Sequence, residues 1–240
     1  MKNLLNDISD NASARSQLYQ LLALGFVHPI EEFHETLING SYPTALSHAA
    51  HAACGVDAVI GQPENSFAAY EAEYIHVFQV GKRGMPVVHL NAGDYSELLG
   101  SGSRPEFLLE YSGWYRLFGL KTNEDTLANE LPDHIVCQLE LLAWLTHLEE
   151  SSADRPDLQR GYQCAQRDFC ERHLQHFLEM MVTALQKANS HSPINPFFLN
   201  LSTLSLEAVT VMQNQFNGAL GESVAQIHNP DQIASVNLWG

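Results

Sequence analysis

The segment Glu130–Glu149 carries the side chains with the clearest chemical potential in this chain. Asp133, Glu140 and His147 stand seven residues apart. On a helix they share one face, and the two carboxylates lie about 10 Å apart along its axis. In one interpretation, Asp133 stabilises the positive end of a core helix and Glu140 forms an ordinary ion pair. In the other, the row is an anionic slot, because carboxylates bind guanidinium groups in a bidentate manner.

A second group of reactive side chains lies between residues 164 and 176. Cys170 and His173 are three residues apart, so they could hold a metal ion on one face of a helix. Cys164 and His176 do not share that face, and no C-x-x-C pair completes a site. We therefore expect no metal site and interpret all four cysteines as free thiols, namely Cys54, Cys137, Cys164 and Cys170.

Aromatic residues precede the longest glycine-rich stretch. Tyr70, Tyr74 and Phe78 recur at helical spacing, and the helical pattern then stops from Gly81 to Ser103. Aromatic side chains at this spacing usually belong to a core. Beside a long loop they can also line an apolar groove that receives a peptide. The sequence leaves both interpretations open.

Composition and missing motifs exclude several classes of protein. The chain has 12 Lys and Arg against 28 Asp and Glu, a net charge of −16 that repels phosphate groups and anionic lipid, so we expect no nucleic-acid partner. The phosphate-binding, dinucleotide-binding, nucleophile-elbow and H-E-x-x-H motifs are absent, which leaves an enzymatic function weakly supported. With no signal peptide and no apolar stretch of about 18 residues, we expect a cytoplasmic protein without stable membrane insertion.

The elements that must position these residues are helices throughout. Prolines and glycines punctuate an apolar periodicity typical of helices, and alternation at period two is missing. We expect an all-α fold, a single bundle of roughly eight or more helices, with 132–149 as a central buried helix. Residues 1–217 should form this domain, with a boundary between two sub-bundles near 119–130, and 218–240 a polar tail. The expected helices cover about 10–28, 30–39, 43–55, 65–78, 105–118, 132–149, 156–187 and 196–216.

Four segments in order resemble one known family. Glu130–His134, followed by Leu139 and Glu140, resembles the signature E-x-P-D-H…E-L-E. The stretch Arg15–Pro29 resembles the family's first helix, and Glu73–Gly81 resembles its E-Y-x-x-L-F-x-G segment. Phe169–Leu204 resembles its F-x-x-x-H-L…P-F-Y-x-x-L-A-x-L pattern. Together these segments resemble the TorD/DmsD/NarJ family of redox-enzyme maturation chaperones, although residues 81–89 lack its usual proline- and aromatic-rich stretch.

The resemblance implies a TorD-like cytoplasmic chaperone with no catalytic residue, cofactor or metal of its own. Such chaperones bind the twin-arginine signal peptide and the body of a molybdopterin-containing catalytic subunit, and delay export or assembly until the cofactor is inserted. Whether the chain is a monomer or a domain-swapped dimer stays open. The alternative is a metal-dependent or acid–base enzyme that uses His134, Glu140, Cys170 and His173. The peptide-binding residues carried over from the family are Tyr74, Phe78, Pro132, Asp133, His134 and Glu140.

Overall fold

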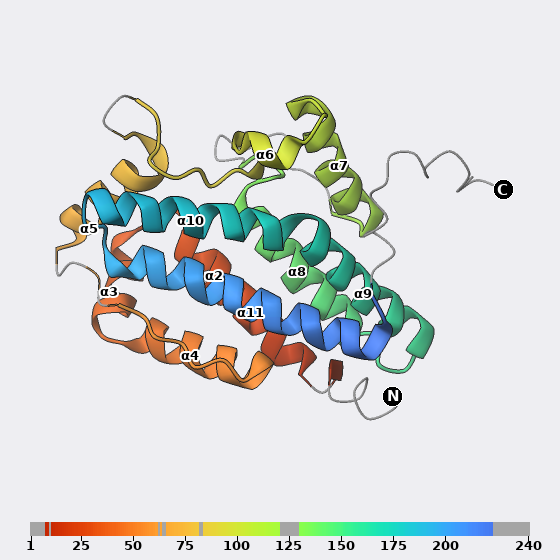
Figure 1. Ribbon diagram of the computed structural model, residues 1–240. Coiled ribbons are helices and arrows are strands. Elements are labelled where there is room, and N and C mark those ends of the chain that lie inside the picture. Colours follow the sequence, from red (N-terminus) through yellow and green to blue (C-terminus); the bar gives the residue numbers. More distant parts are fainter. Residues whose placement is uncertain are drawn as a thin grey trace.

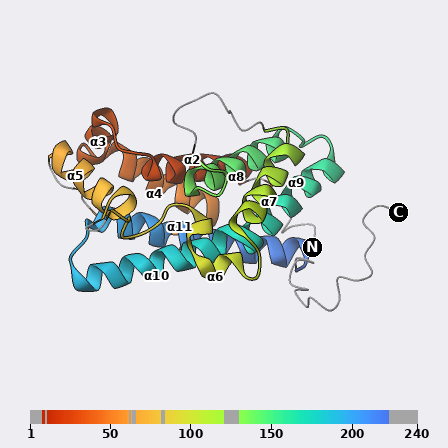
Figure 2. The same ribbon diagram turned by 90° about the horizontal axis from the view of Figure 1, so that it is seen from above.

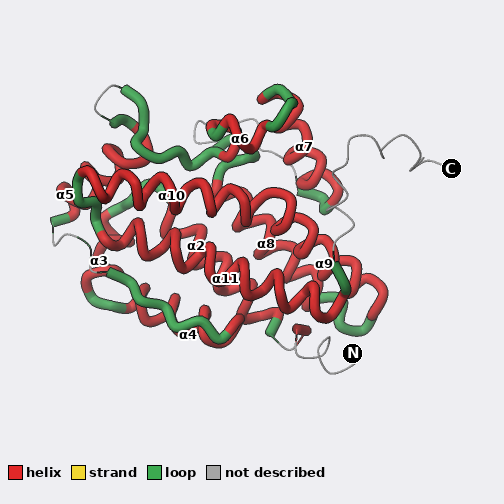
Figure 3. The backbone as a smooth tube through the Cα atoms, viewed as in Figure 1, coloured by secondary structure: helices red, strands yellow, loops and turns green. Residues whose placement is uncertain are grey.

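The computed structural model describes residues 8–9, 11–61, 63, 66–81, 84–120 and 130–222. Within these ranges the chain forms helices and no β-strand, apart from one isolated bridge between Asn91 and His134, which confirms the all-α prediction (Figure 3). The α-helices are α2 (Ala12–Phe26), α3 (Glu31–Ile38), α4 (Ser41–Cys54), α5 (Phe67–Tyr74), α6 (Ser96–Leu99), α7 (Arg104–Leu117), α8 (Ile135–Glu150), α9 (Pro156–Phe169), α10 (Gln175–His191) and α11 (Pro196–Leu220). Shorter turns are η1 (Ile75–Gln79), η2 (Ala92–Asp94) and η3 (Cys170–Leu174).

Local chemistry sets most of the helix ends near their expected positions. Glycines with positive φ, Gly40 and Gly55, flank α4, where a side chain would be strained. The start of α7 has a capping box, in which Ser103 and Glu106 satisfy each other's backbone donors. At the start of α11, the Asn195 side chain accepts a hydrogen bond from the amide of Phe197 at 3.0 Å.

Helix α8 is the central buried helix that its apolar sequence predicts. Leu139 and Leu142 are fully buried in it. Helix α2 packs along α8 in the antiparallel direction, with Arg15 bound to Glu149 and the Ser16 hydroxyl donating to the carbonyl of Ala143 at 3.2 Å. The last turn of α2 therefore lies at the same end of the bundle as the start of α8. Helices α10 and α11 pack side by side in front of this pair (Figure 1).

Two helices contain a π-turn that the periodicity did not predict. The expected helix 156–187 is continuous but switches to π geometry at Cys170–Leu174 before it resumes as α10. Helix α5 likewise ends in the π-turn η1, after which the chain enters the glycine-rich segment. That segment is irregular apart from η2 and α6, and it leads to α7 on the outside of the bundle (Figure 2). Such π-turns occur frequently at functional sites.

The expected start of the central helix is wrong by three residues. Pro132 and Asp133 lie in a turn, His134 is the N-cap, and α8 begins at Ile135. The reason is a tertiary contact, because the amide of Ile135 donates to the carbonyl of Leu90, and Asn91 pairs with His134. Asp133 therefore does not share a helical face with Glu140 and His147.

The expected sub-bundle boundary and tail stay predictions. Most of 119–130 and all of 223–240 lie outside the described residues, and α11 continues to Leu220. The four cysteines are free thiols, as expected. Within the described part of the chain, no helix is long and apolar enough to span a membrane.

Candidate functional site

Asp133 is a fully buried carboxylate that holds the glycine-rich segment against the start of α8. Its Oδ1 accepts a hydrogen bond from the Asn91 side chain at 3.0 Å, and its Oδ2 accepts one from the amide of Gly93 at 2.8 Å. Arg104 lies 3.8 Å from Oδ2 and also pairs with Asp94. A Cβ on Gly93 would come within 2.9 Å of Oδ2, so this close approach requires glycine. The carboxylate is thus occupied by groups of its own chain.

His134 is the neutral N-cap of α8. Its Nδ1 accepts a hydrogen bond from the amide of Val136 at 3.3 Å, so the ring carries its proton on Nε2, which lies 3.6 Å from Glu130 Oε2. Burial lowers the pKa of His134, and the charges of Glu130 and Asp133 oppose that shift in part. The side chain is almost fully buried, so it is not available for direct contact with a partner.

Tyr74 and Phe78 belong to an aromatic cluster in the core. Their rings lie 5.2 Å apart, and both pack on Phe198 at the start of α11, at 6.0 and 5.2 Å. The Tyr74 hydroxyl donates to the carbonyl of Phe26 at 2.8 Å. Burial raises the pKa of Tyr74, and the negative charge of Glu130 adds to the shift. These two aromatic residues join α5, α2 and α11.

Above these buried residues lies a surface with apolar and acidic side chains, which we call the bundle-end surface. Its centre is His28, whose Nδ1 lies 3.3 Å from Gln79 Nε2 and whose Nε2 lies 3.3 Å from Glu71 Oε1. The His28 ring contacts Tyr74 edge-on at 5.4 Å. Glu71 and Glu130 are both at least one-third exposed. We assign to it the exposed and polar side chains at the end of α2, on α5 and η1 and just before α8, namely Leu24, Val27, His28, Glu71, Gln79, Glu130 and Leu131, of which the three apolar residues are all exposed.

Sequence reasoning missed most of this surface. His28 and Glu71 are 43 residues apart, and His28 and Gln79 are 51 apart, so no local pattern links them. Only the antiparallel packing of α2 on α8 and the docking of Tyr74 on α2 bring them together. The sequence did contain one signal for this surface. Three of the four family-like segments, at residues 15–29, 73–81 and 130–140, contribute to this end of the bundle.

The four residues of the alternative enzyme hypothesis lie in two pairs, with His134 and Glu140 on α8 and Cys170 and His173 in η3. Glu140 is exposed on α8, and partial desolvation raises its pKa. Cys170 is buried against Tyr19, and burial raises its pKa to about 12, so it is a thiol at neutral pH. His173 lies between Trp114 and Glu110, at 3.2 and 3.3 Å from its Nε2. Among the residues that the structure describes, no group of three or more His, Cys, Asp or Glu could hold a metal ion.

The buried cap gives a testable pH dependence. The pKa of His134 is lower in the folded chain than in the unfolded chain. At pH values below about 6.5 the unfolded chain therefore binds a proton at this residue more readily than the folded chain does. Folding stability should therefore fall as the pH drops through that range. His134→Asn keeps an acceptor for the Val136 amide but cannot ionise. Urea unfolding of this variant between pH 7.5 and 5.5 should show a smaller loss of stability than the wild type, whereas equal losses would contradict the buried neutral cap.

Comparisons with known proteins show what this chain is similar to. A family model described as the nitrate reductase delta subunit matches residues 39–183. The chain is 31% identical over 241 residues to the dimethyl sulfide dehydrogenase assembly chaperone protein of Rhodovulum sulfidophilum, covering 98% of this chain and 96% of that one. It is 32% identical over 194 residues to the perchlorate reductase assembly chaperone protein of Dechloromonas aromatica, covering 75% and 83%. It is 31% identical over 188 residues to the selenate reductase assembly chaperone protein of Thauera selenatis, covering 78% and 84%. The chain therefore belongs to the nitrate reductase delta subunit family of redox-enzyme assembly chaperones.

Proposed function

We propose that this protein is a cytoplasmic assembly chaperone for the catalytic subunit of a molybdenum-containing oxidoreductase, and that it binds that subunit's twin-arginine signal peptide until the cofactor is inserted. The names of the relatives support the general role, since each is an assembly chaperone for a dehydrogenase or reductase. The observation that carries the peptide-binding part is the bundle-end surface, where family-like segments far apart in the sequence meet.

The chemistry of this surface matches such a peptide. A twin-arginine peptide has two guanidinium groups followed by an apolar stretch, so its receptor needs carboxylates beside apolar side chains. Glu71 and Glu130 supply carboxylates, while Leu24, Val27 and Leu131 supply apolar area. The net charge of −16 adds long-range attraction that speeds association and weakens with salt.

The six residues carried over from the family would then act mostly from behind the surface. Tyr74 and Phe78 hold η1 against α2 and α11, while Asp133 and His134 fix the start of α8. The carbonyl of Pro132 accepts a hydrogen bond from the Tyr115 hydroxyl at 2.6 Å, which attaches α7 to this turn. Glu140 is exposed on α8 and remains available for contact with the body of the client.

The double variant Glu71→Gln/Glu130→Gln tests whether these two carboxylates bind the arginines of the peptide. We expect it to bind a synthetic peptide with two arginines and a leucine-rich stretch about tenfold more weakly than the wild type, given up to about 1 kcal/mol for each exposed ion pair. Calorimetric titration at low salt measures this difference. A second peptide with both arginines replaced by alanine should bind the wild type and the variant equally.

A matched control removes two exposed acids at the other end of α8. Glu150→Gln/Asp154→Asn changes the net charge by the same amount but lies far from the bundle-end surface. It should keep nearly the wild-type affinity. Equal losses in the two double variants would mean that only the net charge matters, and no measurable binding by the wild type would refute the peptide-binding proposal itself.

A further inference from the structure

Arg104 carries a guanidinium group that the chain binds with its own carboxylates. It pairs with Asp94, and it lies 3.8 Å from the Oδ2 of Asp133. The guanidinium also lies against Gly93, because a Cβ at that position would be 3.3 Å from Arg104 Nη1. We call the site formed by Gly93, Asp94 and Asp133 the guanidinium cradle. It combines a fully buried carboxylate with a glycine that leaves room for a planar cation.

Arg104 can leave the cradle without unfolding its surroundings. Its side chain is 32% exposed and that of Asp94 is 34% exposed, so solvent screens the pair and its contribution to stability is small. The start of α7 does not depend on the Arg104 side chain, because the capping box of Ser103 and Glu106 fixes it. Asp133 keeps two hydrogen bonds from its own chain when Arg104 is absent. The cradle therefore persists when it is vacated.

The charges around the cradle favour a cation. Asp94 and Asp133 both face the guanidinium, Asp94 through its Oδ1. The other oxygen of Asp94 lies 3.6 Å from the Nδ1 of His89, which orients this carboxylate from its far side. A second guanidinium could take the place of Arg104 with the same contacts, because carboxylates bind this group with directional, charge-assisted hydrogen bonds.

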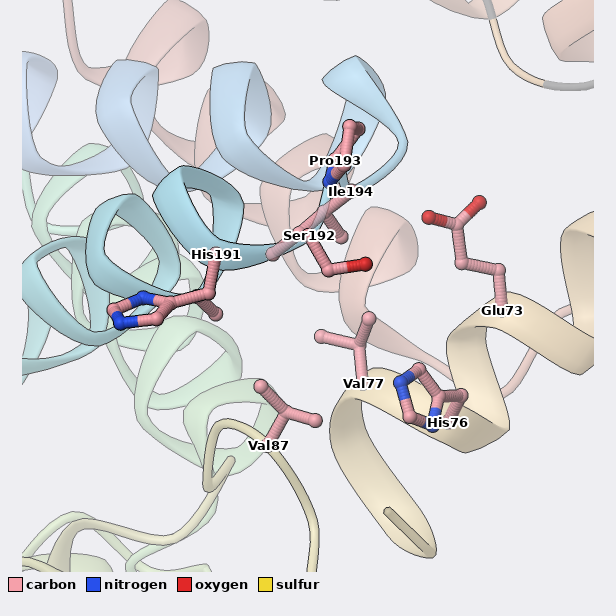
Figure 4. Close-up of a pocket in the computed structure, with 9 residues that line it drawn as sticks. Glu73, His76, Val77, Val87, His191, Ser192, Pro193 and Ile194 are labelled. Atoms are coloured by element: carbon pink, nitrogen blue, oxygen red, sulfur yellow. The ribbon is translucent and has the colours of Figure 1, made fainter. Parts of the chain in front are cut away.

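A cavity elsewhere on the described surface lacks this selectivity. It lies between α5, η1 and the linker that joins α10 to α11, and its volume is about 240 Å³. Its polar lining combines the carboxylate of Glu73 with His76, His191 and Ser192 (Figure 4). This mixture selects neither sign of charge, whereas the cradle already holds the kind of group that it selects.

We propose that Arg104 occupies the guanidinium cradle in place of an arginine of the client peptide, which displaces it on binding. This inference rests on the proposed function and adds to it a further arginine-binding residue, Asp94, and an autoinhibitory contact. The cradle lies near the bundle-end surface, since Asp133 is three residues from Glu130 and their Cα atoms are at most about 11 Å apart. Neighbouring side chains of an extended peptide point to opposite sides. One of two adjacent arginines can therefore contact the bundle-end surface while the other reaches Asp94.

Removing the internal guanidinium tests the inference. We expect Arg104→Gln to bind the peptide with two arginines and a leucine-rich stretch about fivefold more tightly than the wild type, because the wild type must first vacate the cradle. Calorimetric titration measures this difference. The peptide with both arginines replaced by alanine should bind the two proteins equally. If Arg104 only supports the fold, its loss should instead weaken the binding of both peptides by the same factor.

Asp94→Asn is the complementary variant. It should bind the peptide with arginines more weakly than the wild type, since the cradle loses its exposed carboxylate. Adding Arg104→Gln to Asp94→Asn should then give no tighter binding. This lack of additivity would show that the two residues act on one site.

Two further variants control for charge and folding. Arg116→Gln changes the net charge by the same amount at an exposed position near the end of α7, and it should change both affinities by less than about twofold, because solvent screens a distant charge. Arg104→Lys keeps a cation beside Asp133 if Arg104→Gln does not fold. A lysine ammonium cannot contact two carboxylates with the fork of a guanidinium. This variant should therefore also bind the peptide with arginines more tightly than the wild type.

The outcomes separate the inference from the proposed function. If the wild type distinguishes the two peptides but neither Arg104 variant binds the peptide with arginines more tightly, the cradle is not an arginine site and the proposed function stands. If the wild type binds neither peptide, the proposed function fails and the inference fails with it.

Discussion

Glu149→Ala should destabilise the protein by about 3–5 kcal/mol, because it leaves a buried guanidinium without its counter-ion. Glu149 and Arg15 are both almost fully buried, and their charged groups lie 2.5 Å apart. The remaining capacity of the carboxylate is filled by the side chains of Gln163 and Gln166, each donating at 2.8 Å. This network joins α2, α8 and α9, so its loss should be measured as a lower midpoint in urea unfolding with an unchanged slope.

Two further variants distinguish the buried charge from simple loss of packing. Replacing both partners with apolar residues, as in Arg15→Met/Glu149→Leu, should recover most of the stability lost by Glu149→Ala, because no unpaired charge remains. Glu150→Ala removes the neighbouring exposed carboxylate and should change stability by no more than about 0.5 kcal/mol. If Glu149→Ala lowers the free energy of unfolding by less than about 1 kcal/mol, this ion pair does not stabilise the packing of α2, α8 and α9.

The sequence predicted the helices well because their ends are determined locally. Pro156 and Pro196 each occupy the first turn of a helix, and Gly40 and Gly55 flank α4 with backbone that favours glycine. The apolar character of residues 135–148 also predicted a buried central helix. These signals need only a few neighbouring residues, so they can be read without knowledge of the fold.

The sequence could not predict features that depend on distant pairs. Glu149 has the appearance of a solvated residue at a helix end, and only the antiparallel position of α2 places Arg15 beside it. Asp133 fits the first turn of a helix, but contacts with residues 90–93 end the helix before it and bury its carboxylate. Tyr74 and Phe78 fit a groove or a core equally well, and the position of Phe198 decides for the core.

Asp133→Asn is the second substitution for which we expect a large effect. From the sequence it is a conservative probe of charge, but in the structure both carboxylate oxygens accept hydrogen bonds, one from the side-chain nitrogen that Asn91 presents and one from the backbone amide of Gly93, which can only donate. An asparagine offers one oxygen and turns an NH₂ group toward one of these donors. With a buried donor left unsatisfied and the pairing with Arg104 lost, we expect a loss of about 2 kcal/mol or more in urea unfolding.

Peptide binding by this variant shows whether Asp133 supports the bundle-end surface or binds the arginines of the peptide directly. If it supports the surface, the folded Asp133→Asn protein should bind the peptides with and without arginines more weakly by the same factor, since the start of α8 and the turn before it have shifted for both. Glu140→Gln, a matched change at an exposed carboxylate, should keep stability within about 0.5 kcal/mol. A variant as stable as the wild type that no longer distinguishes the two peptides would instead mean that Asp133 leaves its partners to bind arginine directly. The hydrogen bonds from Asn91 and Gly93 and the complete burial of the carboxylate argue for the supporting role.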